Sequence, residues 1–371
     1  MRFFSCLIAG LLCAVLLAGC ASQVPLQTAE VPRYRVDASW PKQLPNKWMI
    51  GQVSGMAVDK HDHIWVLQRP RTLTPDEAWA AQNPPKGECC VPAPAVLVFD
   101  VEGNLLKSWG GPGHVPDWPV SEHGIHVDAN DDVWLAGAGE GDIVLKFDND
   151  GKFLMKIGER PKGRQLQNNQ SAQPGRIAGM EVDEAAREIY LADGYLNRRV
   201  AVYDADTGAF KRGWGAYGIP LSAIDNDTPP AYDPAVISKQ FTNPVHCAHI
   251  SNDGMVYVCD RGGNRIQVFT RQGQFIKEFF VDRSIRERGS AGTLHFSRDP
   301  QQKYLVIGDI VNNVMWILQR EDGKIVGRFG SHGRNAGQWH WLHVATEDSK
   351  GSIYTGEVDT GKRIQKFVRE N

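Results

Sequence analysis

The chain has 371 residues, of which 42% are hydrophobic, and a formal net charge of −2 at pH 7. This length is ample for one large hydrophobic core. A net charge so close to zero gives no positive field for nucleic acid, so no nucleic-acid partner is expected. The 38 glycines and 21 prolines are typical of a β protein with many turns.

The first 20 residues have the pattern of a cleaved export signal. Arg2 precedes an apolar run, 3–17, that is too short for an ordinary membrane span. The run ends in Leu-Ala-Gly-Cys at 17–20, which resembles the lipobox of bacterial lipoproteins. The resemblance implies cleavage before Cys20 and acylation of its thiol, and several acyl chains on one cysteine give stable anchoring.

Three regions are therefore expected: a lipoprotein signal peptide over 1–20, a polar tether over 21–33 and one folded domain over 34–371. The residue after Cys20 is alanine rather than aspartate, which by the usual sorting pattern favours the outer membrane over the inner one. We expect a monomer in the bacterial cell envelope, facing the periplasm, that meets the membrane only through its lipid anchor.

A short apolar pattern recurs six times along the chain. Its openings are residues 53–59, 123–128, 177–183, 245–251, 294–299 and 342–348. Each is followed by a second strand-like run, most by a third, and several by a fourth after a glycine turn. Repeats of roughly 40–50 residues with four strands apiece are typical of a β-propeller. We predict an all-β, six-bladed propeller with almost no helix.

The last repeat lacks a clear fourth strand, and residues 34–40 are expected to supply it and close the ring. A β-sandwich is the alternative fold, but it does not explain the repetition. Two long insertions, 70–94 and 219–241, exceed ordinary connections and are long enough to cover a channel mouth.

Histidines gather at one repeat position. The first strand of each blade lines the central channel of a propeller, so equivalent positions form a ring. The aligned ring reads Ser54, His123, Ala178, His246, His295 and His343. Imidazoles from repeats two, four and six alternate around the axis and would converge on one point. Three histidines with one open position hold catalytic zinc in many proteins, although imidazole also suits other transition metals.

We therefore predict a metal site of His123, His246 and His343, while the alignment alone does not exclude His295. The alternative is a set of core or rim histidines without a metal. His126 and His249 share a second repeat position, three residues further on. Strand alternation predicts that these two point away from the channel and pack between blades.

Three polar side chains stand where the second strands end, at the mouth expected to carry the histidine ring. They are Arg69, Tyr195 and Arg261. Arginine can hold a carboxylate through two hydrogen bonds, and a tyrosine beside a metal can act as a general base. The alternatives are a packing role for Tyr195 and a local ion pair between Asp260 and Arg261.

Four cysteines remain once Cys6 and Cys13 leave with the signal and Cys20 is acylated. Their compartment is oxidising. Cys247 and Cys259 would lie nearly opposite on paired strands, so they form either a disulfide or two buried thiols. A bridge between Cys89 and Cys90 is also open, and nothing in the sequence decides it.

Six segments resemble the lyase domain of peptidylglycine α-amidating enzymes, a six-bladed propeller of the NHL-repeat type. They are residues 51–59, 122–125, 193–200, 244–246, 260–267 and 342–343, and the resemblance extends over nearly all of 51–367. It implies that the family's three zinc ligands fall on His123, His246 and His343. It also implies that the family's active-site arginine and tyrosine fall on Arg69 and Tyr195.

Enzymes of that family cleave the C–N bond of a peptidyl-α-hydroxyglycine, giving a peptide amide and glyoxylate. The resemblance implies a zinc-dependent lyase in which zinc polarises the α-hydroxyl, Tyr195 takes its proton and Arg69 holds the substrate carboxylate. The carbinolamide then collapses as its oxyanion is stabilised. The expected partner is a small-molecule or peptide substrate.

The chain departs from the family near the site. Trp341 replaces a methionine, Val344 replaces a carboxylate used for structural calcium, and Leu196 replaces a disulfide cysteine. Zinc is therefore the expected cofactor, and calcium is not carried over. His295 is additional to the family triad, as a spare ligand or a substrate contact. Arg261 and Trp341 are the other expected substrate contacts.

Two other functions remain open. A metal-dependent propeller hydrolase would keep the metal and cleave a lactone or ester, but such enzymes usually hold calcium through carboxylate and Asn ligands. A non-enzymatic NHL propeller would bind peptides, glycans or proteins at the cell envelope through its rim. Metal content separates both enzymes from the binding module, and glyoxylate release separates the lyase from the hydrolase.

Overall fold

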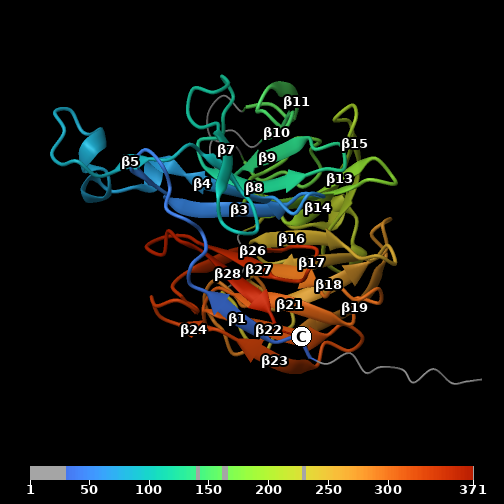
Figure 1. Cartoon of the computed structure of the whole chain (residues 1–371). Coiled ribbons are helices and arrows are strands. Elements are labelled where there is room, and N and C mark those ends of the chain that lie inside the picture. Colours follow the sequence, from blue (N-terminus) through green and yellow to red (C-terminus); the bar gives the residue numbers. More distant parts are fainter. Residues whose placement is uncertain (1–30, 139–142, 161–165, 228–230, 371) are drawn as a thin grey trace, which may run out of the picture. The chain divides into compact units, whose positions relative to one another are not determined.

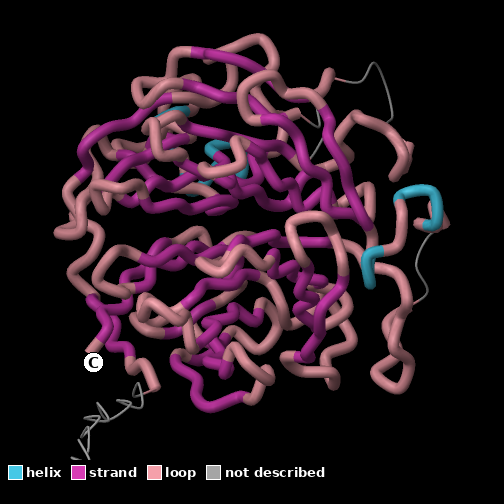
Figure 2. The backbone as a smooth tube through the Cα atoms, turned by 90° about the vertical axis from the view of Figure 1, so that its right-hand side faces the viewer, coloured by secondary structure: helices cyan, strands magenta, loops and turns pink. Residues whose placement is uncertain are grey.

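The computed structural model describes residues 31–138, 143–160, 166–227 and 231–370 (Figure 1). The expected signal peptide, Cys20 and most of the tether lie outside the described residues. Six antiparallel four-stranded sheets surround a central axis, so the predicted all-β, six-bladed propeller is confirmed. Figure 2 shows a backbone of strands and loops in which helix is confined to short segments.

The first three blades follow one another directly along the chain. Blade 1 contains β3 (Gln52–Val58), β4 (Ile64–Arg69), β6 (Val96–Phe99) and β7 (Leu105–Trp109). Blade 2 contains β8 (Glu122–Val127), β9 (Val133–Gly137), β10 (Val144–Phe147) and β11 (Phe153–Ile157). Blade 3 contains β12 (Ile177–Asp183), β13 (Glu188–Asp193), β14 (Arg199–Asp204) and β15 (Phe210–Trp214).

The last three blades complete the ring. Blade 4 contains β16 (Val245–Ile250), β17 (Val256–Asp260), β18 (Arg265–Phe269) and β19 (Phe275–Phe280). Blade 5 contains β20 (Thr293–Phe296), β21 (Tyr304–Asp309), β22 (Val314–Gln319) and β23 (Ile325–Phe329). Blade 6 contains β26 (Leu342–Glu347), β27 (Ile353–Glu357), β28 (Ile364–Arg369) and β1 (Tyr34–Asp37).

The ring is closed by strands from both ends of the folded region. β1 pairs antiparallel with β28, from Tyr34 opposite Arg369 to Asp37 opposite Lys366. In Figure 1 the blue β1 accordingly lies beside the red strands of blade 6. The predicted closure is confirmed, although the strand is shorter than the segment 34–40.

A repeated aspartate fixes the hairpin between the first and second strands of a blade. Asp59 accepts a hydrogen bond from Trp65 Nε1 at 2.9 Å, and Asp128 accepts one from Trp134 Nε1 at 3.0 Å. Each carboxylate also accepts backbone N–H groups of its own turn. This Asx-type turn sets the register of the two innermost strands.

Each first strand except that of blade 5 carries a β-bulge near its beginning. The pairing register shifts across Ser54, across His123 and Gly124, across Ala178, across His246 and across His343. An inserted residue re-aims its side chain and reverses the alternation of faces beyond it. The bulge therefore decides which side chains of each blade face the axis.

Ion pairs hold the loops that follow three of the second strands, and two of these pairs are fully buried. Arg199 Nε lies 2.8 Å from Asp193 Oδ2 with both side chains fully buried, and Arg265 makes the same contact with Asp260 at 2.7 Å. A third pair joins Glu357 and Arg363 at 2.6 Å. Arg199 also donates to backbone carbonyls of 169, 171 and 173, tying the loop before blade 3 to its second strand.

The remaining elements are short. β2 (Trp48–Met49) pairs with β5 (Val91–Pro92), and β24 (Ser331–His332) pairs with β25 (Gln338–Trp339). The 3-10 helices are η1 (Pro70–Thr72), η2 (Pro75–Glu77), η3 (Trp79–Ala81), η4 (Ala216–Gly218) and η5 (Leu221–Ala223). Among the described residues, none of these helices has the length and apolar character to cross a membrane.

The structure contains two disulfides, Cys247–Cys259 across the β16–β17 hairpin and Cys89–Cys90 in the insertion 70–94. The first joins the two strands beside the bulge at His246. The insertion borders the rim of the propeller, where Arg71 Nη2 lies 3.3 Å from a carboxylate oxygen of Glu122.

Replacing Arg199 by methionine is expected to destabilise the fold by about 3–5 kcal/mol, because it leaves the Asp193 carboxylate buried and unpaired. Urea unfolding followed by circular dichroism measures the change. Arg187→Met is the matched control, because Arg187 pairs with Asp206 at the exposed surface. The control should leave the unfolding midpoint nearly unchanged, and equal effects of the two substitutions would contradict the assignment.

Candidate metal centre

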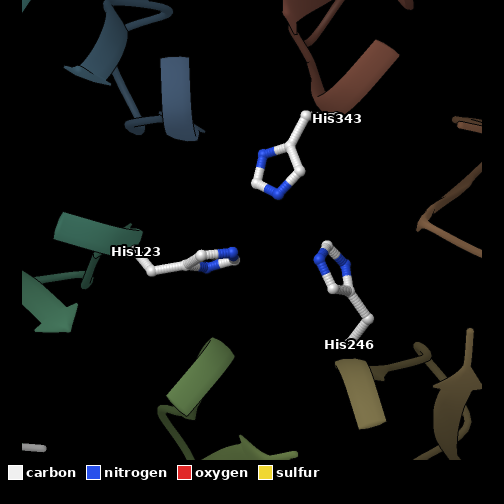
Figure 3. A group of neighbouring side chains, drawn as sticks. All are labelled: His123, His246 and His343. Carbon is white, nitrogen blue, oxygen red and sulfur yellow. The ribbon is translucent and has the colours of Figure 1, made fainter. Parts of the chain in front are cut away.

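Three histidines from alternate blades meet on the propeller axis. His123, His246 and His343 are the second residues of β8, β16 and β26. Their ring centroids are 4.9–5.4 Å apart, and one ligand nitrogen of each lies within 4.8 Å of the others. Figure 3 shows the three rings pointing at one another from separate strands. All three side chains are buried.

The bulges explain this convergence. Each of the three histidines stands in the irregular part of its first strand, where the pairing with the second strand shifts register. The equivalent bulges of blades 1 and 3 present Ser54 and Ala178, whose small side chains leave room for the three imidazoles.

His295 does not belong to this ring, which corrects its expected role as a spare ligand or substrate contact. His295 pairs with Val306 as His249 pairs with Tyr257, so these two histidines are the equivalent residues of blades 5 and 4. The ring position of blade 5 is Gly292, whose carbonyl oxygen contacts His246 Nδ1. The alignment matched His295 to His246, whereas the strand pairing makes it equivalent to His249, three residues further along.

Burial lowers the pKa of all three histidines well below the ordinary value of 6.5. The second-largest cause is electrostatic: the neighbouring imidazoles and the guanidinium groups of Arg69 and Arg261 lower these pKa values further. The three rings are therefore neutral at neutral pH, the form in which imidazole binds a metal.

The donor set fits a transition-metal ion. Nδ1 of His246 is oriented by a backbone carbonyl, which leaves Nε2 as the nitrogen that faces the centre. The Nδ1 atoms of His123 and His343 are buried without a hydrogen-bond partner. Three convergent neutral imidazoles with no carboxylate among them form an all-nitrogen set of three ligands, as zinc and related ions prefer.

Tyr195 lies directly against the histidines. Its hydroxyl is 3.1 Å from Nε2 of His123 and 3.1 Å from Nε2 of His246, and it accepts a hydrogen bond from Arg261 at 3.1 Å. Tyr195 follows β13 through Gly194. A side chain at Gly194 would collide with the backbone of Val245, so glycine is what allows this close approach.

Arg69, the last residue of β4, is held at the rim of the same site. Its Nε donates to the carbonyl of Glu122 at 2.8 Å, and its Nη1 donates to Gln52 Oε1 at 3.0 Å. Both contacts fix the plane of the guanidinium group. Arg69 can therefore present a positioned cation to a carboxylate next to the histidines.

A cavity of about 230 Å³ opens over this group. Its lining includes the expected residues Arg69, Tyr195, Arg261 and Trp341, together with His123 and His343. Gln52, Arg288 and Asp359 also line it and were not expected from the sequence. Arg288 stacks over Trp341 with its guanidinium carbon 4.6 Å from the ring centroid. Gln52 stands directly before a repeat opening, but nothing in the sequence marks Arg288.

His126 and His249 face the channel rather than the space between blades, which corrects the expected packing role. Both line a second cavity at the other end of the channel, together with His295. Simple alternation would place a residue three positions beyond the ring on the opposite face. The bulge adds one residue and returns it to the axis.

Comparison with known proteins finds two groups of distant relatives, while no family model matches the chain. NHL repeat-containing protein 3 of Mus musculus is 26% identical over 91% of this chain and 85% of its own length. Peptidyl-alpha-hydroxyglycine alpha-amidating lyase 1 of Drosophila melanogaster is 22% identical over 91% of this chain and 60% of its own length. The chain is therefore distantly related to NHL repeat proteins and to amidating lyases.

A streptogramin B lyase structure superimposes with a TM-score of 0.55 at 13% identity, covering 92% of this chain and 98% of that one. At this identity the similarity supports the propeller fold alone.

The stability of the metal-free protein is expected to fall as the pH drops below about 6.5. The folded state keeps its three central histidines neutral, whereas the unfolded state binds protons at the ordinary histidine pKa of 6.5. Stability is therefore present above that pH and is lost below it. Urea unfolding in chelator at several pH values between 5.5 and 7.5 measures the effect.

The control is a variant in which His123, His246 and His343 are all asparagine. Burial raises the pKa of Glu347 to about 7, so this group makes the folded state more stable as the pH falls, opposite to the histidines. Both proteins contain Glu347, so its contribution is the same in each. The variant should depend less on pH over this range. An equal dependence in the two proteins would mean that the central histidines titrate normally.

Proposed function

We propose that this protein is a metal-dependent lyase, with zinc preferred, that cleaves the C–N bond of a peptidyl-α-hydroxyglycine-like carbinolamide to an amide and glyoxylate. The observation that carries the proposal is the contact of Tyr195 with two of the three convergent histidines and with Arg261. The distant relationship to amidating lyases supports the same reaction class.

In this proposal His123, His246 and His343 would hold the metal through their inward nitrogens. A bound zinc ion supplies Lewis-acid polarisation of the substrate hydroxyl oxygen. The burial that keeps the imidazoles neutral also lowers the effective dielectric constant at the same point. The low local polarity strengthens the electrostatic contacts that surround it.

Tyr195 is the proposed general base. Its phenol oxygen accepts a hydrogen bond from Arg261, which places a positive charge beside the oxygen that acts as the base. Tyr195 removes the hydroxyl proton of the carbinolamide, and the oxygen electron pair forms the aldehyde C=O bond. The C–N bond breaks with its electron pair on nitrogen, and Tyr195 returns the proton to that nitrogen, so atoms and charges balance.

Arg69 is the proposed anchor of the substrate carboxylate. Its contacts with Gln52 and the carbonyl of Glu122 orient the guanidinium group before substrate binds. This preorganisation reduces the entropy lost on binding. Trp341 and Arg288 form another part of the wall of the 230 Å³ cavity and are placed to contact the rest of the substrate.

A binding module is the second candidate function, because the relatives include NHL repeat-containing proteins that match over 85% of their length. In that case the rim of the propeller would contact a peptide, glycan or protein. The buried histidine cluster would then have a structural role.

We expect the purified protein to release glyoxylate from α-hydroxyhippurate, with the activity lost on chelation and restored by Zn²⁺. His246→Ala should remove both the bound metal and the activity. Tyr195→Phe should keep the metal and lower kcat by about 10²–10⁴, the usual contribution of a general base. Arg69→Gln should act mainly on KM. Glyoxylate assays and metal analysis of each variant measure these effects.

The matched control is His332→Ala, because His332 is an exposed histidine outside the cavity. It should retain metal and activity. Bound metal without glyoxylate release would rule out the lyase reaction, and a wild-type protein that binds no metal would leave the binding module as the function.

We further propose that the chain is a lipoprotein of the bacterial outer membrane, anchored through Cys20 and facing the periplasm. Leu17-Ala18-Gly19-Cys20 supports this proposal. Mass spectrometry of the mature N-terminal peptide should find Cys20 first and acylated, and Cys20→Ala should abolish the lipid. A mature chain that begins elsewhere would contradict the anchor.

A further inference from the structure

A second cavity, of about 420 Å³, lies at the other end of the channel. First strands of all six blades line it, so it is centred on the propeller axis. At the repeat position three residues beyond the ring, the blades present Ala57, His126, Glu181, His249, His295 and Thr346. Three imidazoles and a carboxylate thus come from four consecutive blades.

The two levels belong to one channel. His123, His246 and His343 are called the central trio below. A cavity of about 70 Å³ contacts both His246 of this trio and His249 of the second level. Gly55, Gly124 and Gly179 line this middle section. It is a narrow passage that reaches the side chains of both levels. The second level is therefore stacked along the axis from the trio and does not share its ligands.

Glu181 orients His249 for binding through its free nitrogen. His249 Nδ1 lies 2.5 Å from Glu181 Oε2, and the other carboxylate oxygen accepts the backbone N–H of Ile250 at 3.1 Å. The carboxylate fixes the tautomer with the proton on Nδ1 and leaves the lone pair on Nε2. Metal-binding histidines commonly have this carboxylate partner.

His295 stands next to His249 with ring centroids 6.2 Å apart. This separation is wider than the 4.9–5.4 Å between the rings of His123, His246 and His343. His295 Nε2 is 3.4 Å from Thr293 Oγ1, a hydroxyl that can rotate away. Burial lowers the pKa of His295 to about 3 and also lowers that of His126, so both imidazoles are neutral at neutral pH.

The cavity offers little competing positive charge. Arg298, the one Lys or Arg among its described lining residues, donates to the backbone carbonyls of Asp348 and Glu347. Its guanidinium group is thereby held at the wall. Glu181 contributes a negative charge on the same level as the imidazoles.

We propose that His249 and His295 bind one divalent transition-metal ion in this second cavity, with Glu181 positioning His249 and His126 on the facing wall. Imidazole ligands favour Zn²⁺, Cu²⁺ or Ni²⁺ over Mg²⁺ or Ca²⁺. The ion joins blades 4 and 5 and is independent of the lyase reaction proposed for the other cavity.

Metal stoichiometry tests this site. The full chain is stripped with chelator, equilibrated with Zn²⁺ by dialysis and analysed for zinc per folded chain, with circular dichroism confirming the fold. We expect two equivalents in the wild type and one in the variant H123A/H246A/H343A. H249A/H295A should also retain one. Titration of the variant H123A/H246A/H343A with Cu²⁺ should give an absorption band. Adding H249A/H295A to that variant should remove the band.

Two further variants sharpen the result. Glu181→Gln should weaken zinc binding in the trio variant by about 10–100-fold, the usual effect of losing such a partner. H332A/H340A is the matched control, because this surface pair has ring centroids 5.8 Å apart. It should change nothing. A folded trio variant without zinc, or loss of the second equivalent in H332A/H340A, would overturn the proposal.

Discussion

The β-bulge at the start of the first strand is the constraint on which the channel chemistry depends. It places the three central histidines on the axis in blades 2, 4 and 6. It also turns the residues three positions later toward the axis, because the extra residue reverses the alternation of faces. In these five blades one backbone irregularity thus creates two levels of inward-facing side chains, where a regular strand would place them at other positions.

The site concentrates positive and neutral groups at the point where a metal would sit. Arg69, Arg261 and Arg288 line its cavity with Asp359 as the acidic residue among them. The pKa values of the imidazoles are lowered, because protonation would place a positive charge on a buried group beside two guanidinium ions. The imidazoles are therefore neutral. Such surroundings favour an anionic ligand, because the three guanidinium groups outnumber the one carboxylate.

Repetition made most of the fold predictable. The six openings, the closing strand and the convergence of His123, His246 and His343 all follow from equal spacing and channel geometry. The bulges left no mark in the residue pattern, so His126 and His249 were assigned to the wrong face. In blade 5 the aligned opening was three residues out of step, so His295 was matched to His246 instead of its equivalent His249. Arg288 lies in a loop outside the repeat, where periodicity carries no information.

Closure of the ring by β1 and β28 has a consequence for the order of events in the cell. His343 belongs to a blade whose four strands come from the beginning and the end of the folded region. Without either end of the folded region, blade 6 lacks a strand, and His343 then has no complete sheet to fix its position. A metal ion held by the three histidines would therefore bind only after both ends of the folded region have paired.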